Sequence, residues 1–452
     1  MILDYKKYHL VGIQGVGMTA LALILADMGK EVTGSDSGEE FLTGEYLRKR
    51  SIKLFTSFSQ ENISDTQCVI YTGAHNGVQN IEVQEALQRN IPMYSLAQFV
   101  GELTNSKKTI SICGCHGKTT TTALAVLAGE ALGIPMSYYV GGAGFAGHSS
   151  GKWCNGGYFA LESDEYVADP VADKVAKLEY IHPYAILCTN IDFDHPDVYS
   201  SIEEVEKVYL EYFKRLPQEG KLIICGEDER LVRVAKQSGH AFTTYQLNTE
   251  KPFQTALIGR HNQLNIIGVA TLFSELGYNT ADLSSAFVNF TGVSRRQEKI
   301  YENNNKIVFD DYGHHPAEIA ATIKAVKSAY PAHHVTVLFQ PHTYSRTEAL
   351  KKEFIKALSI ADDSFIFPIF GSAREKASDY SISSDRLIDL SKQSGIHTIQ
   401  TIHTDDELTA TTEKLTSQYS KLVIMTMGAG DVYKKHDLIK KALSSVQNSN
   451  AR

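Results

Sequence analysis

The sequence lacks the features of a membrane-spanning, secreted or fibrous protein. None of its apolar runs approaches the ~20 residues needed to cross a bilayer. The N-terminal residues MILDYKKYHLVGIQGVG contain no uninterrupted apolar segment before a small-residue cleavage site. Short-period repeats and low-complexity segments are also missing, which argues against a solenoid. We therefore expect a cytoplasmic globular protein.

The chain has few cysteines and no excess of positive charge. The six cysteines are scattered without the spacing of a disulfide framework, so reduced thiols are expected. They are Cys68, Cys113, Cys115, Cys154, Cys188 and Cys225. The formal net charge of −8 argues against broad binding to a phosphate backbone. No nucleic-acid partner is expected, although a local basic pocket remains compatible with this charge.

What the sequence does contain is a regular alternation of short apolar strands and helical segments. With 452 residues and 43% hydrophobic composition, the chain can form several cores. The alternation predicts α/β domains with mainly parallel, helix-covered sheets. Expected strands in the second half of the chain are 222–225, 335–339, 364–370 and 421–427. Polar breaks near 105–107 and 294–296 predict three domains, 1–105, 106–294 and 295–452.

The stretch SICGCHGKTTTT (111–122) resembles a phosphate-binding loop but is shortened. The usual pattern G-x-x-x-x-G-K-[ST] requires a glycine where Ile112 stands. Gly114 and Gly117 nevertheless allow backbone N–H groups to approach phosphate oxygens after a strand and before a helix. Lys118 is placed to reach terminal phosphates, and the Thr119 hydroxyl is placed to ligate Mg²⁺. The sequence therefore favours a phosphate site.

The residues of this stretch are also compatible with a metal site or with a plain turn. A metal could bind Cys113, Cys115 and His116, although Cys-x-Cys-His is not a usual zinc spacing. The glycines could also form a turn without any ligand. The threonine run falls in the first helical turn, where its hydroxyls are expected to act as local caps.

Acidic residues follow two later apolar strands. FALESDEY (159–166) delivers three carboxylates about 45 residues after the phosphate loop, which suits a Mg²⁺ ligand. TNIDFDHPD (189–197) ends another strand in polar, chelating residue types. Each cluster taken alone also fits a solvated loop. Together, and after a phosphate loop, they favour a site for ATP and Mg²⁺.

A second glycine loop lies near the N-terminus. Gly12, Gly15 and Gly17 follow an apolar strand, but their spacing is not that of the dinucleotide fingerprint. Asp36 lies about 20 residues further, at the end of a second strand, where a partner for a ribose hydroxyl is expected. The loop is compatible with a nucleotide or sugar nucleotide, with an NAD-dependent oxidoreductase, or with a turn that only packs a helix.

Polar clusters also follow strands in the last third of the chain. FDDYGHHP (309–316) and QPHTYSR (340–346) concentrate Asp, His and Arg at strand ends, which is typical of active-site loops. GRHNQLN (259–265) opens a helix, so helix capping is the alternative to a functional role there. A non-catalytic nucleotide-binding regulator would also contain such loops.

The motifs occur together in one order along residues 8 to about 435. GCHGKTTTT, ESDE, TNIDFDH, GRHNQLN, GVSRRQE, DDYGHHP, QPHTYSR and GAGD together resemble the Mur ligases, the ATP-dependent amino-acid ligases of peptidoglycan synthesis. That family has a short phosphate loop of the form G-x-x-G-K-T, which accounts for the missing glycine. The resemblance implies Rossmann-like first and third domains and a P-loop ATPase-like central domain.

The resemblance also implies an activity. ATP and Mg²⁺ would drive the joining of L-alanine to UDP-N-acetylmuramate through an acyl phosphate, releasing ADP and phosphate. ESDEYVADP and the following DK also resemble the murein-recycling ligase of the family, which attaches a stem tripeptide, so this substrate is the alternative. A monomer or homodimer that hinges near 294–296 is expected. A carbamylated lysine is not, because only Lys207 lies near the corresponding position.

Site roles are implied residue by residue. The UDP-sugar would contact Gly12, Gly15, Val16, Gly17, Asp36, Thr72 and Ala74. ATP would contact Gly114, Cys115, His116, Gly117, Lys118, Thr119, Thr120, His261, Asn262, Arg296 and Asp311. Thr119 and Glu162 would ligate one Mg²⁺, and His195 would help to hold a second Mg²⁺ near the substrate carboxylate. The amino acid would be held by His314, His342 and Arg346. The resemblance implies direct catalytic roles for Lys118, His195, Arg296, His342 and Arg346.

Overall fold

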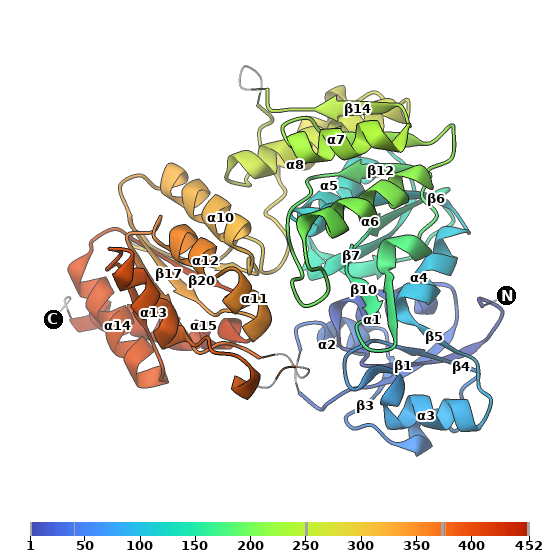
Figure 1. Ribbon diagram of the computed structural model, residues 1–452, viewed down its shortest axis with the longest axis horizontal. Helices are drawn as coiled ribbons and strands as arrows, with labels where there is room; N and C mark the ends of the chain where they lie inside the picture. Colours follow the sequence, from blue (N-terminus) through green and yellow to red (C-terminus); the bar gives the residue numbers. More distant parts are fainter. Residues whose placement is uncertain (1, 40, 249–251, 372–374, 376, 450–452) are drawn as a thin grey trace. The chain divides into compact units, whose positions relative to one another are not determined.

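The computed structural model describes residues 2–39, 41–248, 252–371, 375 and 377–449 of the chain. Two compact units are present (Figure 1). The first comprises Met1–Ala256 with Asn262–Ser294, and the second comprises Leu257–His261 with Arg295–Arg452. Within the described part of the chain, no helix has both the length and the apolar character needed to cross a membrane.

The first unit begins with a five-stranded parallel sheet in the order β3-β2-β1-β4-β5. This is the doubly wound order, in which anions bind at the carboxyl ends of the central strands. The strands are β1 (Lys7–Val11), β2 (Glu31–Ser35), β3 (Lys53–Phe55), β4 (Cys68–Tyr71) and β5 (Met93–Ser95). The helices are α1 (Val16–Asp27), α2 (Gly44–Lys49), α3 (Ile81–Gln88) and α4 (Leu96–Thr104).

The same unit contains a seven-stranded sheet in the order β14-β13-β12-β6-β9-β7-β8, parallel except for the β7–β8 pair. Its strands are β6 (Lys108–Cys113), β7 (Met136–Phe145), β8 (His148–Lys152), β9 (Tyr158–Glu162), β12 (Ala185–Cys188), β13 (Lys221–Cys225) and β14 (Phe242–Tyr245). Its helices are α5 (Lys118–Ala131), α6 (Ile202–Lys214), α7 (Glu229–Ser238), α8 (Arg260–Glu275) and α9 (Ser284–Val288). A hairpin, β10 (Val167–Asp169) and β11 (Asp173–Ala176), stands apart from this sheet. Helix α1 of the first sheet also packs against β7 and β8.

The second unit is built on a six-stranded sheet in the order β15-β16-β20-β17-β18-β19, with only β15 antiparallel. Its strands are β15 (Glu298–Asn303), β16 (Lys306–Asp311), β17 (His334–Phe339), β18 (Asp363–Ile366), β19 (Ile399–Thr401) and β20 (Leu422–Met427). Its helices are α10 (Pro316–Ala329), α11 (Tyr344–Ala349), α12 (Lys351–Leu358), α13 (Ser384–Gln393), α14 (Asp405–Gln418) and α15 (His436–Ser449).

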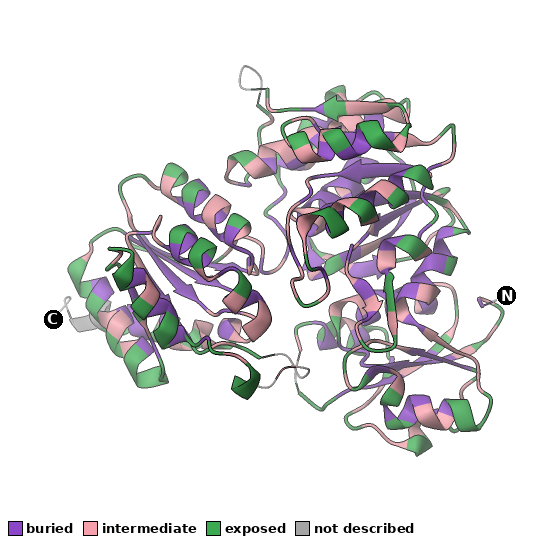
Figure 2. Ribbon diagram, in the orientation of Figure 1, coloured by how far each residue is buried: buried purple, intermediate pink, exposed green. Residues whose placement is uncertain are grey.

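The predicted class, three domains with mainly parallel sheets covered by helices, is confirmed. The central strands of the sheets are buried, edge strands such as β3 and β15 are partly exposed, and the helices expose their outer faces (Figure 2). One predicted strand is wrong in length: 364–370 is cut short, and β18 ends at Ile366. Pro368 follows two residues later and has no N–H group to donate to a neighbouring strand, which explains the early end. The boundary near residue 105 remains a prediction.

Candidate active site

The shortened phosphate loop connects β6 directly to α5. Gly114 and Gly117 have φ angles of +121° and +82°, which side-chain-bearing residues rarely adopt. A Cβ atom at position 114 would lie 2.1 Å from Thr189 Oγ1, so only glycine fits there. Gly117 is the N-cap of α5, and the open N–H groups of this helix end point into the loop. The loop therefore has the backbone geometry of an anion cradle, and its binding of phosphate remains a prediction.

Thr189 and Asn190 brace this loop from the end of β12. Asn190 Oδ1 accepts a hydrogen bond of 2.9 Å from His116 N, and its backbone oxygen accepts one of 3.2 Å from Cys115 N. The Thr189 hydroxyl donates to His116 O over 2.6 Å. Sequence reasoning treated this segment only as a candidate chelating cluster and missed its bracing role. A polar Thr-Asn pair at a strand end was the available signal.

The two threonines deeper in the run do not cap the helix, contrary to expectation. Thr121 Oγ1 donates to Gly117 O over 2.8 Å, and Thr122 Oγ1 donates to Lys118 O over 2.9 Å. Each hydroxyl thus bonds the carbonyl four residues earlier, because that acceptor is the nearest one inside a helix. Thr119 differs, since its hydroxyl leaves the helix.

Thr119 and Glu162, two predicted Mg²⁺ ligands, lie together. The Thr119 hydroxyl donates to Glu162 Oε1 over 2.9 Å, and Gly141 N donates to Glu162 Oε2 over 2.6 Å. A hydroxyl and a carboxylate at the mouth of a phosphate loop are the oxygen donors that Mg²⁺ prefers. The residues present therefore fit this ion.

Lys118 occupies the first position of α5 and faces carboxylates. Its Nζ lies 3.1 Å from Glu165 Oε2, 3.5 Å from Asp164 Oδ1 and 3.3 Å from the Cys115 carbonyl oxygen. Burial disfavours its charge, but the two carboxylates outweigh burial and raise the pKa of Lys118 well above its usual range. The ammonium group is thus fully charged at neutral pH and available to a phosphate.

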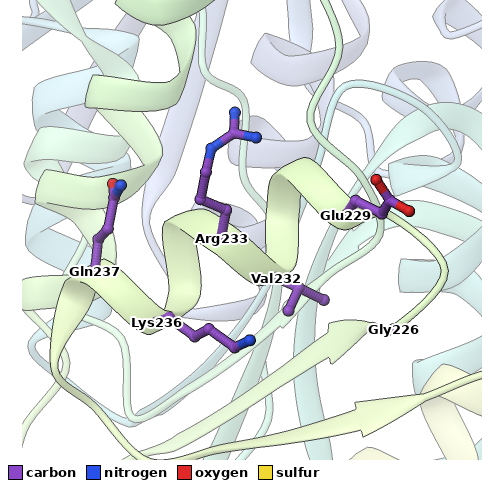
Figure 3. A pocket seen from close by; sticks show the side chains of 6 residues that line it. All are labelled: Gly226, Glu229, Val232, Arg233, Lys236 and Gln237. Atoms are coloured by element: carbon purple, nitrogen blue, oxygen red, sulfur yellow. The ribbon is translucent and has the colours of Figure 1, made fainter.

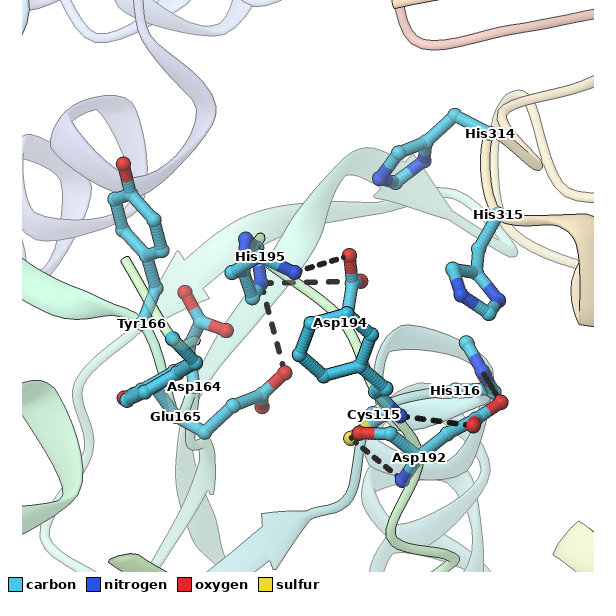
Figure 4. A network of polar contacts seen from close by, with 12 residues as sticks. Cys115, His116, Asp164, Glu165, Tyr166, Asp192, Asp194, His195, His314 and His315 are labelled. Carbon is cyan, nitrogen blue, oxygen red and sulfur yellow. Dashed lines mark hydrogen bonds and ion pairs between the residues drawn. The ribbon is translucent and has the colours of Figure 1, made fainter. Parts of the chain in front are cut away.

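His195 joins the same acidic group. Its Nε2 lies 3.5 Å from Glu165 Oε1 and 3.8 Å from Asp194 Oδ2 (Figure 4). The ligand atoms of Asp164, Glu165 and His195 all lie within 4.8 Å of one another. Burial lowers the pKa of His195, but these carboxylates more than compensate and the net shift is upward. Asp164 and Glu165 were not chosen from the sequence, although the ESDE motif contains both.

Cys115 and His116 contact the 189–197 segment. Cys115 Sγ donates to the Asp192 carbonyl oxygen over 3.1 Å, and His116 Nε2 lies 3.0 Å from Asp192 Oδ2 (Figure 4). Cys113 is buried in β6. The cysteines therefore act as packing and bracing residues of the loop.

The N-terminal glycine loop is tight and lies at the carboxyl ends of β1 and β4. Gly12 has a φ of +81°, and a Cβ atom there would meet Thr72 Cγ2 at 2.9 Å. Asp36 is buried, and its Oδ2 accepts a hydrogen bond of 2.8 Å from Gln14 N. Its carboxylate thus holds the loop itself, a role beyond the predicted ribose contact. Gly15 and Ala74 are exposed at this edge.

In the second unit, the two adjacent arginines differ in environment. Arg295 is buried, with Nε 3.1 Å from Asp310 Oδ2 and its Nη2 donating to Gly428 O over 2.7 Å. Arg296 is more open, and its guanidinium lies over the Tyr312 ring at 4.9 Å. Arg295 is therefore held by contacts within its own unit, whereas the Arg296 guanidinium is partly exposed and lies 3.7 Å from Glu318 Oε1.

Asp311 and His261 are linked through Gln297. Asp311 Oδ2 accepts from Gln297 N over 2.9 Å, and the Gln297 side-chain nitrogen lies 3.1 Å from His261 Nε2. Burial lowers the pKa of His261 to about 4, so a neutral ring accepts this hydrogen bond. Burial also raises the pKa of Asp311 to about 6, although Arg296 opposes the shift.

The predicted amino-acid residues lie at the ends of β16 and β17. The rings of His314 and His342 are 6.1 Å apart, and His342 stacks on Phe370 at 5.9 Å. Arg346 is buried in α11. Thr343, just before this helix, has a φ of +68°, an uncommon backbone conformation that is often found at functional sites.

A separate hollow along α7 contains none of the predicted site residues (Figure 3). It is lined by Gly226, Glu229, Val232, Arg233, Lys236 and Gln237.

Comparison with known proteins places this geometry in a family. Residues 7–108 match the Mur ligase family catalytic domain, residues 155–265 the Mur ligase middle domain, and residues 295–447 the Mur ligase glutamate ligase domain. The chain is 34% identical over 453 residues to a UDP-N-acetylmuramate–L-alanine ligase of Desulfitobacterium hafniense strain Y51, covering 94% of this chain and 97% of that one. The chain belongs to the Mur ligase family.

Solved structures of Mur ligases have the same fold. The UDP-N-acetylmuramate-alanine ligase MurC of Thermotoga maritima is 26% identical and superposes with a TM-score of 0.76, covering 98% of this chain and 99% of that one. A murein peptide ligase of Psychrobacter arcticus 273-4 superposes with a TM-score of 0.73 over 97% of this chain and 98% of that one. Its identity of 20% supports a shared fold alone.

Proposed function

We propose that this Mur ligase joins L-alanine to UDP-N-acetylmuramate while ATP is converted to ADP and phosphate. The observation that carries the proposal is the 34% identity, over 94% of the chain, to a ligase of that name. The phosphate loop, with Lys118 and the Thr119–Glu162 pair, supports the ATP-dependent part of the reaction.

Joining a carboxylate to an amine requires activation of the carboxylate. In the first step an oxygen of the acceptor carboxylate attacks the γ-phosphorus of ATP, and the bond to ADP breaks. Lys118 would exchange its contact with Glu165 for the transferring phosphate, while the loop N–H groups hold the remaining oxygens. Thr119 and Glu162 would hold one Mg²⁺ and His195 would help to hold a second, and these ions when bound would neutralise phosphate charge. The product is an acyl phosphate.

In the second step the amine nitrogen of L-alanine attacks the acyl carbon, phosphate leaves, and the nitrogen loses a proton. We assign His314, His342 and Arg346 to the amino-acid pocket, because Arg346 offers a cation for the amino-acid carboxylate and the two imidazole rings lie edge to face, 6.1 Å apart. Arg296, Asp311, His261 and Asn262 are assigned to the nucleotide. The first domain, through about residue 105, is assigned to the UDP-sugar.

Location and assembly belong to the same proposal. ATP and a UDP-linked acceptor are substrates available in the cytoplasm, and the reaction would supply a peptidoglycan precursor there. We propose that the protein acts as a monomer or a homodimer.

A phosphate-release assay with ATP, Mg²⁺ and UDP-N-acetylmuramate tests the assignment. L-Alanine, glycine, L-serine and the stem tripeptide are compared as second substrates, with the Lys118→Ala variant as control. Rapid release with L-alanine, lost in the variant, is the expected result. Turnover with the tripeptide but not with L-alanine would replace the proposed substrate by the alternative.

A further inference from the structure

The hydroxyl group of Tyr139 lies directly on the backbone at the start of α1. Tyr139 belongs to β7 of the seven-stranded sheet, whereas α1 begins at Val16 beside the five-stranded sheet. A Cβ atom at Gly17 would lie 2.3 Å from Tyr139 Oη and 3.5 Å from Cζ. Glycine at position 17 therefore makes room for this hydroxyl.

The first turn of α1 is where an anion is expected to bind. The N–H of Thr19 is bonded to the Gly15 oxygen over 2.8 Å. The three preceding N–H groups, residues 16–18, have no carbonyl four positions earlier within the helix. Such groups, together with the helix dipole, attract phosphate. Tyr139 brings a further donor to this place from another part of the chain.

The Tyr139 hydroxyl has a hydrogen available for such a ligand. Among the described residues, none hydrogen-bonds this hydroxyl. Burial, followed by the nearby Glu162 and Asp164 carboxylates, raises the pKa of Tyr139 well above its usual range. The phenol is thus protonated at neutral pH and has a proton to donate to phosphate oxygens, which only accept.

Tyr139 also lies close to the candidate Mg²⁺ ligand Glu162. Gly141, two residues further along β7, donates its N–H to Glu162 Oε2 over 2.6 Å. Alternation along a strand places positions 139 and 141 on one face, and both are more exposed than Val140 between them. The phenol therefore stands between the first turn of α1 and the carboxylate of the phosphoryl-transfer site. A bound sugar nucleotide must span the same distance, from its diphosphate to its reacting carboxylate.

We propose that the Tyr139 hydroxyl donates a hydrogen bond to the diphosphate of UDP-N-acetylmuramate and so positions this substrate. The inference rests on the proposed function, because it assumes that this sugar nucleotide is the acceptor. Tyr139 is a substrate-binding residue in this account and takes no part in bond making.

The test is calorimetric binding of UDP-N-acetylmuramate and of UDP to the Tyr139→Phe variant. Both dissociation constants should rise about tenfold, the order expected when one hydrogen bond to a charged group is lost. The KM values for ATP and L-alanine and the kcat at saturating acceptor should stay within about twofold of wild type. Tyr46→Phe is the matched control, because the Tyr46 hydroxyl also lies against a glycine of the seven-stranded sheet, Gly144, away from the α1 turn.

The Gly17→Ala variant tests the same contact from the other side. Its methyl group should displace the hydroxyl and weaken UDP binding, and adding Tyr139→Phe should cause little further loss. Unchanged binding of both ligands to Tyr139→Phe would overturn the inference while leaving the proposed function intact. Weaker binding of UDP-N-acetylmuramate with unchanged binding of UDP would overturn the assignment to the diphosphate. A wild-type protein that does not bind UDP-N-acetylmuramate would refute the proposed function and this inference with it.

Discussion

The backbone of Gly114 lies directly against the side chain of Thr189. A Cβ atom at position 114 would come within 2.1 Å of Thr189 Oγ1 and 2.9 Å of the Asn190 nitrogen. The same hydroxyl donates to the His116 oxygen, so the phosphate loop is held against the end of β12. The shape of the anion cradle depends on this contact as much as on the loop's own glycines.

Replacing Gly114 with alanine should therefore deform the loop. We expect kcat/KM for ATP to fall by about 100-fold or more, as when an electrostatic contact to the transferring group is lost, together with a lower Tm. Gly133→Ala is the control, since Gly133 also has a positive φ of +69° but no heavy atom lies within 4 Å of its Cβ position. That change should cost about 1 kcal/mol and leave the kinetics unchanged. Equal effects of the two substitutions would contradict the contact.

Thr119→Val should impair the use of Mg²⁺ without affecting stability greatly. The variant loses the hydroxyl that faces Glu162, so we expect kcat to fall by roughly 10- to 100-fold and half-maximal activity to need more MgCl₂. Thr122→Val serves as the control, because its hydroxyl only bonds the Lys118 carbonyl within the helix. The measurement is phosphate release over a MgCl₂ titration. Identical titration curves for Thr119→Val and wild type would rule out Thr119 as a ligand.

Substitution of Arg295 should lower stability, whereas substitution of Arg296 should lower activity. Arg295→Ala leaves Asp310 buried without its guanidinium partner, which should cost about 3–5 kcal/mol of unfolding free energy. Arg296→Ala should leave Tm nearly unchanged but lower kcat/KM for ATP by at least about tenfold. Thermal unfolding and ATP titrations on both variants measure these two effects. The reverse pattern would mean that the two roles are exchanged.

Asp311 should make the stability of the protein depend on pH. Burial raises its pKa to about 6, whereas the unfolded chain titrates near 4. Between these values the folded state binds a proton that the unfolded state has released, so stability falls as pH rises from about 4 to about 6. The difference between the two pKa values corresponds to about 3 kcal/mol of unfolding free energy. The measurement is the Tm of wild type and of Asp311→Asn at pH 4 and pH 7. Relative to wild type, the variant should have a higher Tm at pH 7 than at pH 4. A constant difference would show that Asp311 titrates normally.

The strand-loop-helix units could be predicted from sequence because their signals are local. The apolar run before Gly114 and the helical pattern after Lys118 specify β6 and α5 within one or two residues. The N-terminal apolar strand likewise matches β1, but α1 begins at Val16, three residues before the helical pattern TALALILADMG. The grouping of Thr119 with Glu162 was implied by the resemblance to the Mur ligases, and the structure places the two side chains in contact.

Roles that depend on tertiary placement could not be predicted in this way. The bracing by Thr189 and the position of Tyr139 against Gly17 join segments far apart in sequence, and no spacing rule connects them. The burial of Arg295 beside the more open Arg296 depends on packing against the β20 end. The assignments of individual residues to ATP, UDP-sugar and amino acid remain predictions.

The central claim is that ATP activates the acceptor carboxylate as an acyl phosphate. UDP-N-acetylmuramate labelled with ¹⁸O in that carboxylate, incubated with ATP, Mg²⁺ and L-alanine, tests it most directly. Mass spectrometry should find one ¹⁸O atom in each phosphate released and the alanyl amide in the product, because the attacking oxygen leaves with the phosphorus. Unlabelled phosphate accompanying amide formation would contradict the account.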